Sequence, residues 1–340
     1  MEVVQEPRSD WVAHGVLDRF ATGLPERLGA RVKGQWGCVR FVRSETVLFG
    51  AIELDEVSLS EDRDGADGDA PSPLERVTRE AYDALFGCLK TEDFPYLARV
   101  WNFIPDIIGE HEGQERYRLF NAARQAAFNA AGRAVTGDVP AATGIGLDLA
   151  PLRLQVYFIA SRLRAIPIEN PRQVSAFHYP SQYGVKSPTF ARAVVMPLVD
   201  GPLLLISGTA SIVGHETVHH GDVIAQTHEI FANLSALIAA ANDRVGKDAF
   251  SLARLAYRIY VRRASDIEAV RRVVETHLGS GGRVDVVHNH VAQGDTVRAL
   301  TGGARLHPER LYVRADICRP NLLVEIEASG GGAPARAAAS

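Results

Sequence analysis

The stretch RLYVRADICRPNLLVEIEA, Arg310 to Ala328, carries the densest set of groups that could do chemistry. It joins a β-type run to a second apolar run through an Arg-Pro-Asn turn signal, so we expect two strands that meet at a tight connection. Glu325 follows three apolar residues, and we expect its carboxyl group to be buried. Burial raises the pKa of a carboxyl group and can keep a general acid protonated near neutral pH. The alternative is that Glu325 and Glu327 are solvated residues of an edge strand.

The first strand of this stretch has one polar face and one apolar face. Side chains alternate along a strand, so Arg310, Arg314 and Cys318 are predicted to share a face with Tyr312 and Asp316. The opposite face carries Leu311, Val313, Ala315 and Ile317. We therefore expect two arginines and a cysteine on the face that meets a substrate. The alternative for Cys318 is a small residue that fills the core.

More arginines and tyrosines lie in the middle of the chain, namely Arg172, Arg192, Tyr179 and Tyr183. The guanidinium fork binds planar carboxylates bidentately, which indicates an acidic substrate. Tyrosine rings provide an apolar wall with a polar tip, which suits a cyclic substrate. Thr209, in the run SGTASI, could place its hydroxyl and nearby backbone N–H groups against an anion. Together with one buried acid, these groups favour protonation chemistry without a metal or a cofactor.

Other polar clusters predict less. The histidines at 215, 219 and 220 and those at 288 and 290 have no cysteine or carboxylate at the spacing that completes a ligand set, so we expect no metal site. Gln226, Glu229 and Asn233 fall at helical spacing and are interpreted as a polar helix face. Cys38 and Cys88 are interpreted as small core residues.

The composition excludes several classes of protein. The chain of 340 residues is 46% hydrophobic and has a formal net charge of −4, so it is globular and we expect no nucleic-acid partner. We find no apolar run long enough to span a bilayer, and the acidic beginning does not resemble a secretory signal. We therefore expect a cytoplasmic protein without a membrane partner. Three scattered cysteines make neither a disulfide framework nor a zinc ribbon.

The order of predicted elements repeats along the chain. Each half is predicted as strand, helix, strand, helix, strand, strand, and the closing letters RLQVYFIASRLRAIPIEN lie over RLYVRADICRPNLLVEIE. This repetition predicts an internal duplication. We expect an N-terminal domain over residues 1–170 with an acidic loop near 60–73, a C-terminal domain over 171–330 and a disordered tail over 331–340. The junction at 168–188 is rich in Tyr, Arg and Gln, as binding loops are.

The second half resembles the RidA (YjgF) fold. The matching strings are SPTFARAVVM, ISGTASI, GDVIAQTHEIFANL and the closing ERLYVRADICRPNLLVEIEA. In that family the closing segment carries an arginine that binds a substrate carboxylate, which falls on Arg310, and a glutamate that falls on Glu325.

The whole chain resembles a chorismatase, a family built of two RidA-like halves. The strings are RVWNFIPDI, YRLFNAARQAAF, NPRQVSAFHYPSQYG, SGTASIVGHE and DICRPNLLVEIEA, between about residues 45 and 328. The resemblance implies an α/β (α+β) fold of two chorismate-mutase-like sheets, each with helices on one face. It also implies cleavage of chorismate to pyruvate and a ring product without a cofactor. Glu325 would protonate the methylene of the enolpyruvyl group.

The product is left open by this resemblance. One branch hydrolyses chorismate to a dihydroxycyclohexadiene carboxylate, another forms 3-hydroxybenzoate intramolecularly through an arene oxide, and a third gives mixed hydroxybenzoates. A cysteine seven residues before the catalytic glutamate marks the 3-hydroxybenzoate type, and Cys318 stands there. Two further hypotheses are a RidA-like imine deaminase and a non-catalytic binder of aromatic acids. We expect a monomer, because the two halves supply their own junction.

Overall fold

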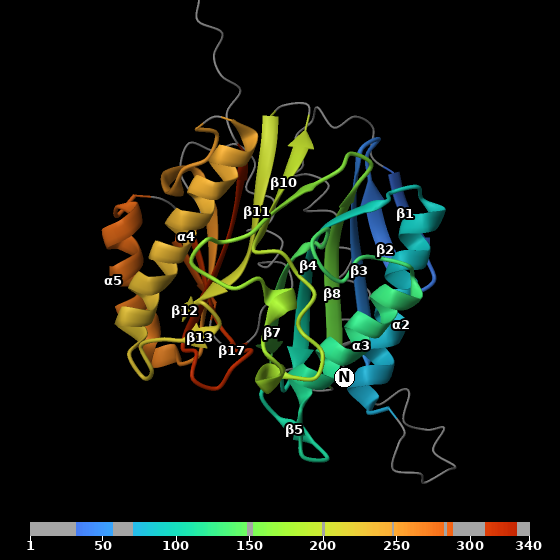
Figure 1. Cartoon of the computed structure of the whole chain (residues 1–340), viewed down its shortest axis with the longest axis horizontal. Coiled ribbons are helices and arrows are strands. Elements are labelled where there is room, and N and C mark those ends of the chain that lie inside the picture. The colour runs from blue at the N-terminus through green and yellow to red at the C-terminus, as the bar shows by residue number, and fades with distance from the viewer. Residues whose placement is uncertain are drawn as a thin grey trace, which may run out of the picture.

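The fold consists of two seven-stranded sheets that face each other, with helices on the two outer sides (Figure 1). It is seen in a computed structural model, which describes residues 32–56, 71–147, 152–198, 201–246, 248–281, 284–287 and 310–331. Most of the predicted lead-in, the acidic loop, the tail, and the histidines at 288 and 290 lie outside these ranges.

The N-terminal sheet has the strand order β1-β2-β3-β8-β4-β7-β17. Its elements are β1 (Val32–Trp36), β2 (Val39–Arg43), β3 (Val47–Asp55), α2 (Pro73–Thr91), β4 (Tyr96–Pro105), α3 (Arg116–Ala130), β7 (Ala141–Leu147) and β8 (Arg153–Ser161), with β17 (Asp316–Ile317) added from the end of the chain. A short hairpin of β5 (Glu110–His111) and β6 (Gln114–Glu115) precedes α3.

The C-terminal sheet has the order β15-β16-β14-β18-β11-β10-β9. Its elements are β9 (Ile166–Ile168), β10 (Ala193–Leu198), β11 (Gly201–Ala210), α4 (Val223–Val245), β14 (Ala256–Val261), α5 (Ile267–Leu278), β15 (Val284–Val287), β16 (Arg310–Arg314) and β18 (Val324–Gly331). The short strands β12 (Ile212–Val213) and β13 (Glu216–Thr217) pair beyond the end of β11.

The internal duplication is confirmed by the topology. The strands β2-β3-β8-β4-β7 of one sheet and β10-β11-β18-β14-β16 of the other have the same order, and each half places one helix after its second strand and one after its third. The predicted overlay of the closing letters was wrong, because β8 corresponds to β18 and not to β16. The sequence pattern also did not reveal β7, whose run AATGIGL is built mostly of small residues.

The two halves exchange short strands. β9 follows β8 along the chain but pairs with β10 of the C-terminal sheet, and β17 follows β16 but pairs with β7 of the N-terminal sheet. β7 also runs beside the C-terminal half, where Ala141 bridges Ala191. The two halves are therefore tied together next to β7. The domain boundary at residue 170 stays a prediction.

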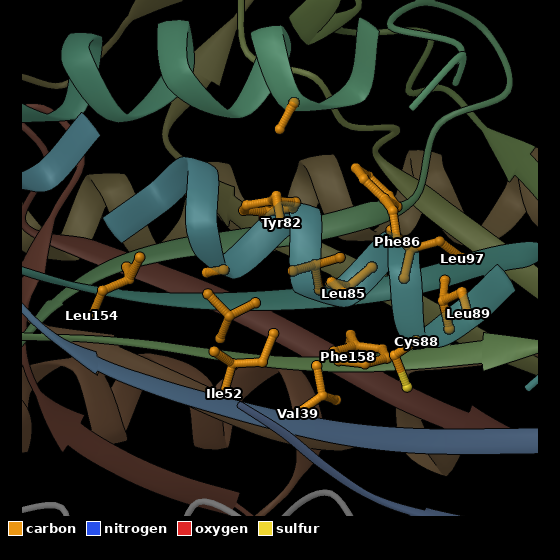
Figure 2. Packing of buried hydrophobic residues seen from close by; sticks show 14 of the residues in the cluster. Val39, Ile52, Tyr82, Leu85, Phe86, Cys88, Leu89, Leu97, Leu154 and Phe158 are labelled. Atoms are coloured by element: carbon orange, nitrogen blue, oxygen red, sulfur yellow. The ribbon is translucent and has the colours of Figure 1, made fainter. Parts of the chain in front are cut away.

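The helices form because they have capped ends and one apolar face. In α2, Ser72 and Glu75 make a capping box and a proline opens the first turn. Figure 2 shows the buried face of α2, with Tyr82, Leu85 and Leu89, packed against residues of the N-terminal sheet. A similar apolar layer lies between α4, α5 and the C-terminal sheet, and a third lies between the two sheets.

Helix α4 corrects one expectation. By length and composition Val223–Val245 could cross a membrane, although no such run was expected from the sequence. In the fold, its buried residues, such as Ile230, Leu234 and Leu237, belong to the apolar layer on the C-terminal sheet. It therefore packs as a core helix of the C-terminal half.

The closing stretch also differs from its prediction. β16 and β18 do not pair with each other, because β14 lies between them. The first strand ends at Arg314, and the chain then leaves the sheet to form β17 with β7. The face alternation predicted as far as Cys318 therefore stops at Arg314.

Candidate active site

Glu325 lies in the centre of the C-terminal sheet and faces the N-terminal sheet. β18 pairs with β14 and β11 on its two sides, and Glu325 is opposite Tyr260 and Ala210. Alternate residues of β18, Val324, Ile326 and Ala328, pack under the helices, so Glu325 projects into the space between the sheets. Its exposed fraction is 4%. The predicted burial is confirmed, and the edge-strand alternative is wrong.

The carboxyl group of Glu325 holds its proton tightly. Its pKa is raised to about 8, mainly by burial and also by the neighbouring Glu327, while Arg99 and Arg192 act in the opposite direction. Within the described part of the chain, its oxygens accept no hydrogen bond and join no ion pair. An unpaired, desolvated carboxyl group favours the neutral acid. At neutral pH, the carboxyl group of Glu325 is therefore mostly in its neutral, protonated form.

Glu327, two residues further along the same face, is fully paired. Arg99 Nη2 donates to Glu327 Oε2 at 2.7 Å, and Trp101 Nε1 donates to Oε1 at 3.0 Å. The Thr143 hydroxyl donates to Oε2 at 2.6 Å, and Arg258 Nη1 donates to Oε1. Arg99, Trp101 and Thr143 belong to the N-terminal half. The cluster of Glu327 with these four donors is the polar centre of the junction between the halves.

Gly208 lies directly beneath Glu325. A Cβ atom added at Gly208 would overlap Glu325 Oε1 and come close to Thr143 Cγ2. The Gly208 N–H donates to Thr143 Oγ1 at 3.0 Å. The pairing of β11 with β18 is irregular between Ile206 and Thr209, so the backbone is displaced at this point. Glycine within a strand here permits a close approach of the acid to the backbone.

Cys318 lies near enough to Glu325 for the two groups to affect each other's charge. Burial raises the pKa of its thiol to about 12, with Glu325 as the next contribution, so the sulfur stays protonated at neutral pH. Tyr117 of α3 is also affected by Cys318 and Glu325, and burial raises the pKa of its hydroxyl. Cys318, Glu325 and Tyr117 therefore surround one small region, to which both halves contribute.

Arginines and tyrosines form the next layer. Arg192 Nη2 donates to the Tyr179 hydroxyl at 2.8 Å and to Val174 O at 2.7 Å, while its Nε has no hydrogen-bond partner. The Arg319 guanidinium stacks 4.0 Å from the Tyr183 ring centroid. Stacked and hydrogen-bonded arginines of this kind are held ready for a planar anion.

A pocket of about 260 Å³ opens beside these residues. One of its lining residues, Arg319, directly follows Cys318 in the sequence. Arg319 and Asn321 of the loop before β18 line it, together with Tyr183. Glu216, Thr217 and His220 complete its lining. Arg319 and Tyr183, which stack on each other, therefore both line this pocket.

Four predicted site residues are not brought to Glu325. Arg310 lies on the opposite face of the sheet, where its Nη2 donates to Leu278 O at the end of α5. Arg314 ends the same strand, opposite Val261. Arg172 pairs with Glu229 at 2.7 Å and donates to Asn233, so it fastens the junction loop to α4.

Thr209 is the fourth predicted site residue that does not contact Glu325. It is paired with Ile326, on the helix side, and its hydroxyl donates to Ser207 O at 3.0 Å. The preceding residue, Gly208, is the one that meets Glu325. The predicted residues that the structure brings together are therefore Glu325, Cys318, Arg192, Tyr179 and Tyr183.

Comparisons with known proteins identify the family of this chain. A chorismatase of Streptomyces rapamycinicus is 38% identical over 232 residues, which cover 66% of this chain and 69% of the relative. The chain belongs to the chorismatase family. A 3-hydroxybenzoate synthase of Streptomyces hygroscopicus is 35% identical over 262 residues, 74% of this chain and 68% of that one.

Two further comparisons concern the N-terminal half and the whole fold. The family model "Chorismatase FkbO/Hyg5-like, N-terminal" matches residues 28–160. The crystal structure of a chorismatase matches with a TM-score of 0.70 and 30% identity, over 88% of this chain and 78% of the other. The predicted fold class, two RidA-like halves of the chorismatase type, is confirmed.

Among the described residues, no group of three histidine, cysteine or carboxylate side chains could hold a metal ion. His219 Nε2 lies 3.4 Å from Glu229 Oε2. The candidate site offers a carboxyl group with a raised pKa, a thiol and cationic side chains.

Three residues of the site, Arg99, Thr143 and Gly208, were not predicted from the sequence. Arg99 and Thr143 are in the first half, far along the chain from Glu325, and nothing in their local pattern marks them. Gly208 could have been found, because a glycine inside a strand run often marks a close approach of another group.

Proposed function

We propose that this enzyme converts chorismate to 3-hydroxybenzoate and pyruvate, with Glu325 as the general acid. The observation that carries the proposal is the burial of the Glu325 carboxyl group at the junction, without a hydrogen-bond donor among the described residues and with its pKa raised. A related protein named 3-hydroxybenzoate synthase and the thiol at Cys318 support the choice of product.

The first step is a proton transfer from Glu325 to the methylene carbon of the enolpyruvyl group. The methylene becomes a methyl group and the adjacent carbon becomes an oxocarbenium ion, bonded to the ether oxygen. General acids whose pKa lies near the working pH are effective in such a step. The carboxylate left on Glu325 is stabilised by Arg99 and Arg192, both of which favour its charged form.

In the second step the ring hydroxyl next to the ether attacks the ring carbon that carries the ether oxygen. The bond from the ring to the ether oxygen breaks, and its electron pair completes the ketone of pyruvate. The hydroxyl proton returns to Glu325, and the arene oxide left on the ring opens to 3-hydroxybenzoate. No atom enters from water, so the products together have the composition of chorismate.

Binding of the two substrate carboxylates is assigned by the same proposal to the arginines near the acid. Arg192 is buried, has an unused Nε and favours the charged form of Glu325. Tyr179 and Tyr183 supply the flat wall beside it, with ring centroids 5.5 Å apart. Fixing a charged ring at both ends keeps the hydroxyl aligned for its attack. Arg310, on the opposite face of the sheet, and Arg314, at the end of β16, are not assigned to the substrate carboxylates.

The second candidate is the hydrolytic reaction with the same acid. Water would attack the oxocarbenium carbon, and the ring would keep both of its oxygens as a dihydroxycyclohexadiene carboxylate. The pocket beside Cys318 favours this candidate, because it gives solvent a way to the region. The raised pKa of the Cys318 thiol is against it, since a neutral thiol does not activate water.

The test is to incubate the purified protein with chorismate in oxygen-18 water and to identify both products by mass. We expect a hydroxybenzoate without label on the ring; pyruvate exchanges its ketone oxygen and is read early. A dihydroxycyclohexadiene product would move the protein to the hydrolytic branch. Chorismate that is not consumed would contradict the proposal as a whole.

We also propose that the enzyme acts as a monomer, because the junction of its own two halves supplies the site. A trimeric mass in solution would contradict this.

A further inference from the structure

We propose that Thr143, on β7 of the N-terminal half, is a positioning residue for Glu325 and acts through the peptide of Gly208. The inference rests on the proposed function, since it concerns the acid of that reaction. It gives the N-terminal half a defined part in catalysis, although the acid lies in the C-terminal half.

The Thr143 hydroxyl lies at the centre of three contacts. It accepts the N–H of Gly208 at 3.0 Å and donates its own proton to Glu327 Oε2 at 2.6 Å. Arg99 Nη2 also donates to it. A hydroxyl has one donor and two acceptor positions, so all of its capacity is used. Its exposed fraction is 3%, so water cannot replace any of the three partners.

Gly208 transmits this arrangement to the acid. Its Cα lies so close to Glu325 Oε1 that an added Cβ would overlap the oxygen. The backbone is irregular between Ile206 and Thr209, and regular pairing with β18 therefore does not hold Gly208 in place. The hydrogen bond to Thr143 does. The floor on which Glu325 rests is thus set from the other half of the molecule.

Neighbouring contacts hold the two halves in register without touching the acid. The Ala142 N–H donates to Ser207 Oγ at 2.9 Å, and the Ala191 N–H donates to Pro140 O at 2.9 Å. These contacts place β7 against the C-terminal half. Thr143 is the residue of β7 that contacts Gly208, and Gly208 in turn contacts Glu325.

The alternative is that Thr143 only stabilises the Glu327 cluster. Trp101 separates the two explanations, because its Nε1 donates to Glu327 Oε1 at 3.0 Å. Trp101→Phe removes a buried partner of Glu327 but leaves Gly208 and Thr143 in contact. It is therefore the matched control for Thr143→Val.

The experiment compares Thr143→Val, Thr143→Ser and Trp101→Phe. For Thr143→Val we expect kcat to fall about 10- to 100-fold with KM within about threefold, since misplacing a reacting group by about 1 Å costs up to 100-fold. We expect Thr143→Ser to recover most of kcat because it keeps the hydroxyl. We expect Trp101→Phe to lose stability but to keep kcat within about threefold.

A second readout needs no turnover. In Thr143→Val the Gly208 N–H is free to donate to Glu325, and a hydrogen bond to the charged form favours that form. The titration midpoint of Glu325, read as the infrared difference from Glu325→Gln, is expected to move below that of the wild type. In Trp101→Phe it is expected to stay closer to the wild type.

These readouts separate the two ideas. A wild type that does not consume chorismate would contradict the proposed function, while the infrared midpoints still test the inference about Thr143. A Thr143→Val variant with the midpoint and kcat of the wild type would overturn the positioning role. Equal effects in Thr143→Val and Trp101→Phe would overturn it as well, in favour of a purely structural cluster.

Discussion

The two halves share one topology and each buries a glutamate on its inner face, but the two glutamates differ in their surroundings. Glu53 on β3 accepts a hydrogen bond from the Tyr157 hydroxyl at 3.3 Å and lies between Arg40, at 3.9 Å, and Arg153, at 3.8 Å. Glu325 on β18 has no such partner among the described residues and rests on Gly208.

The comparison shows that burial alone does not make a catalytic acid. Burial raises the pKa of Glu53 as well, but two guanidinium groups beside it favour its charged form. Arg99 and Arg192 lie near Glu325, but Arg99 pairs with Glu327, and Arg192 donates to Tyr179 and Val174. In the C-terminal half, Glu327 carries the paired charge and Glu325 is left as a neutral acid next to the other half.

The largest expected effect is on turnover, when the carboxyl group of Glu325 is removed. Glu325→Gln is expected to lower turnover by about 1,000-fold or more, since a general acid contributes about 10²- to 10⁴-fold, and to leave substrate binding largely intact. For Glu53→Gln, the matched change in the other half, turnover is expected to stay within about threefold of the wild type. Steady-state kinetics and calorimetric binding measure both. Unchanged turnover in Glu325→Gln would remove the general-acid proposal.

The next effect concerns the floor under the acid. Gly208→Ala would push Glu325 Oε1 aside, and we expect kcat to fall about 10- to 100-fold. Gly50→Ala is the control, because its methyl group would overlap the Phe158 ring in the N-terminal core. We expect it to cost about 1–3 kcal/mol of stability but to leave kcat of the folded enzyme within about threefold. Wild-type kcat in Gly208→Ala would contradict the geometry at Glu325.

A smaller effect is expected at the thiol. Cys318→Ala removes a neutral, half-buried thiol near the acid, and turnover is expected to fall by less than about 10-fold because the proton donor is intact. The product ratio is expected to shift towards the water-derived product, because the methyl group leaves room beside the oxocarbenium carbon. Cys38→Ala, a half-buried thiol in the other half, is the control. Chromatography of the products measures the ratio, and equal ratios in both variants would remove Cys318 from the choice of product.

The smallest effect is on stability. Because the folded state raises the pKa of Glu325 from 4.5 to about 8, it binds the proton more tightly than the unfolded chain. Stability from this group is present at low pH and is lost as pH rises through that interval. Glu325→Gln lacks this loss and is expected to exceed the wild type by about 1–3 kcal/mol at pH 9, but not at pH 5. Urea unfolding at both values measures it, and an equal difference at both would contradict the raised pKa.

The parts of this fold with a strong local pattern could be predicted from the sequence. α5 was expected at Ile267–Leu278 and lies there, because its apolar residues recur at helical spacing. The burial of Glu325 followed from the apolar residues around it. β7 was not predictable in the same way, because AATGIGL has small side chains and two glycines, which weaken any strand signal.

The candidate site was predicted in part, and its errors have a physical reason. The polar face of β16 was expected to meet the substrate, but the apolar residues Leu311 and Val313 face the layer between the two sheets, and Arg310 lies on the helix side. The contact from Thr143 to Gly208 joins residues 65 positions apart. Contacts of this kind depend on how the halves dock, which no local pattern specifies.

The central claim is that Glu325 is a neutral acid at physiological pH. The most direct measurement is an infrared pH titration of the wild type, with Glu325→Gln as the reference. The account predicts a protonated carboxyl band at pH 7 that is present only in the wild type and disappears with a midpoint near pH 8. A Glu325 that is already a carboxylate at pH 6 would contradict the account.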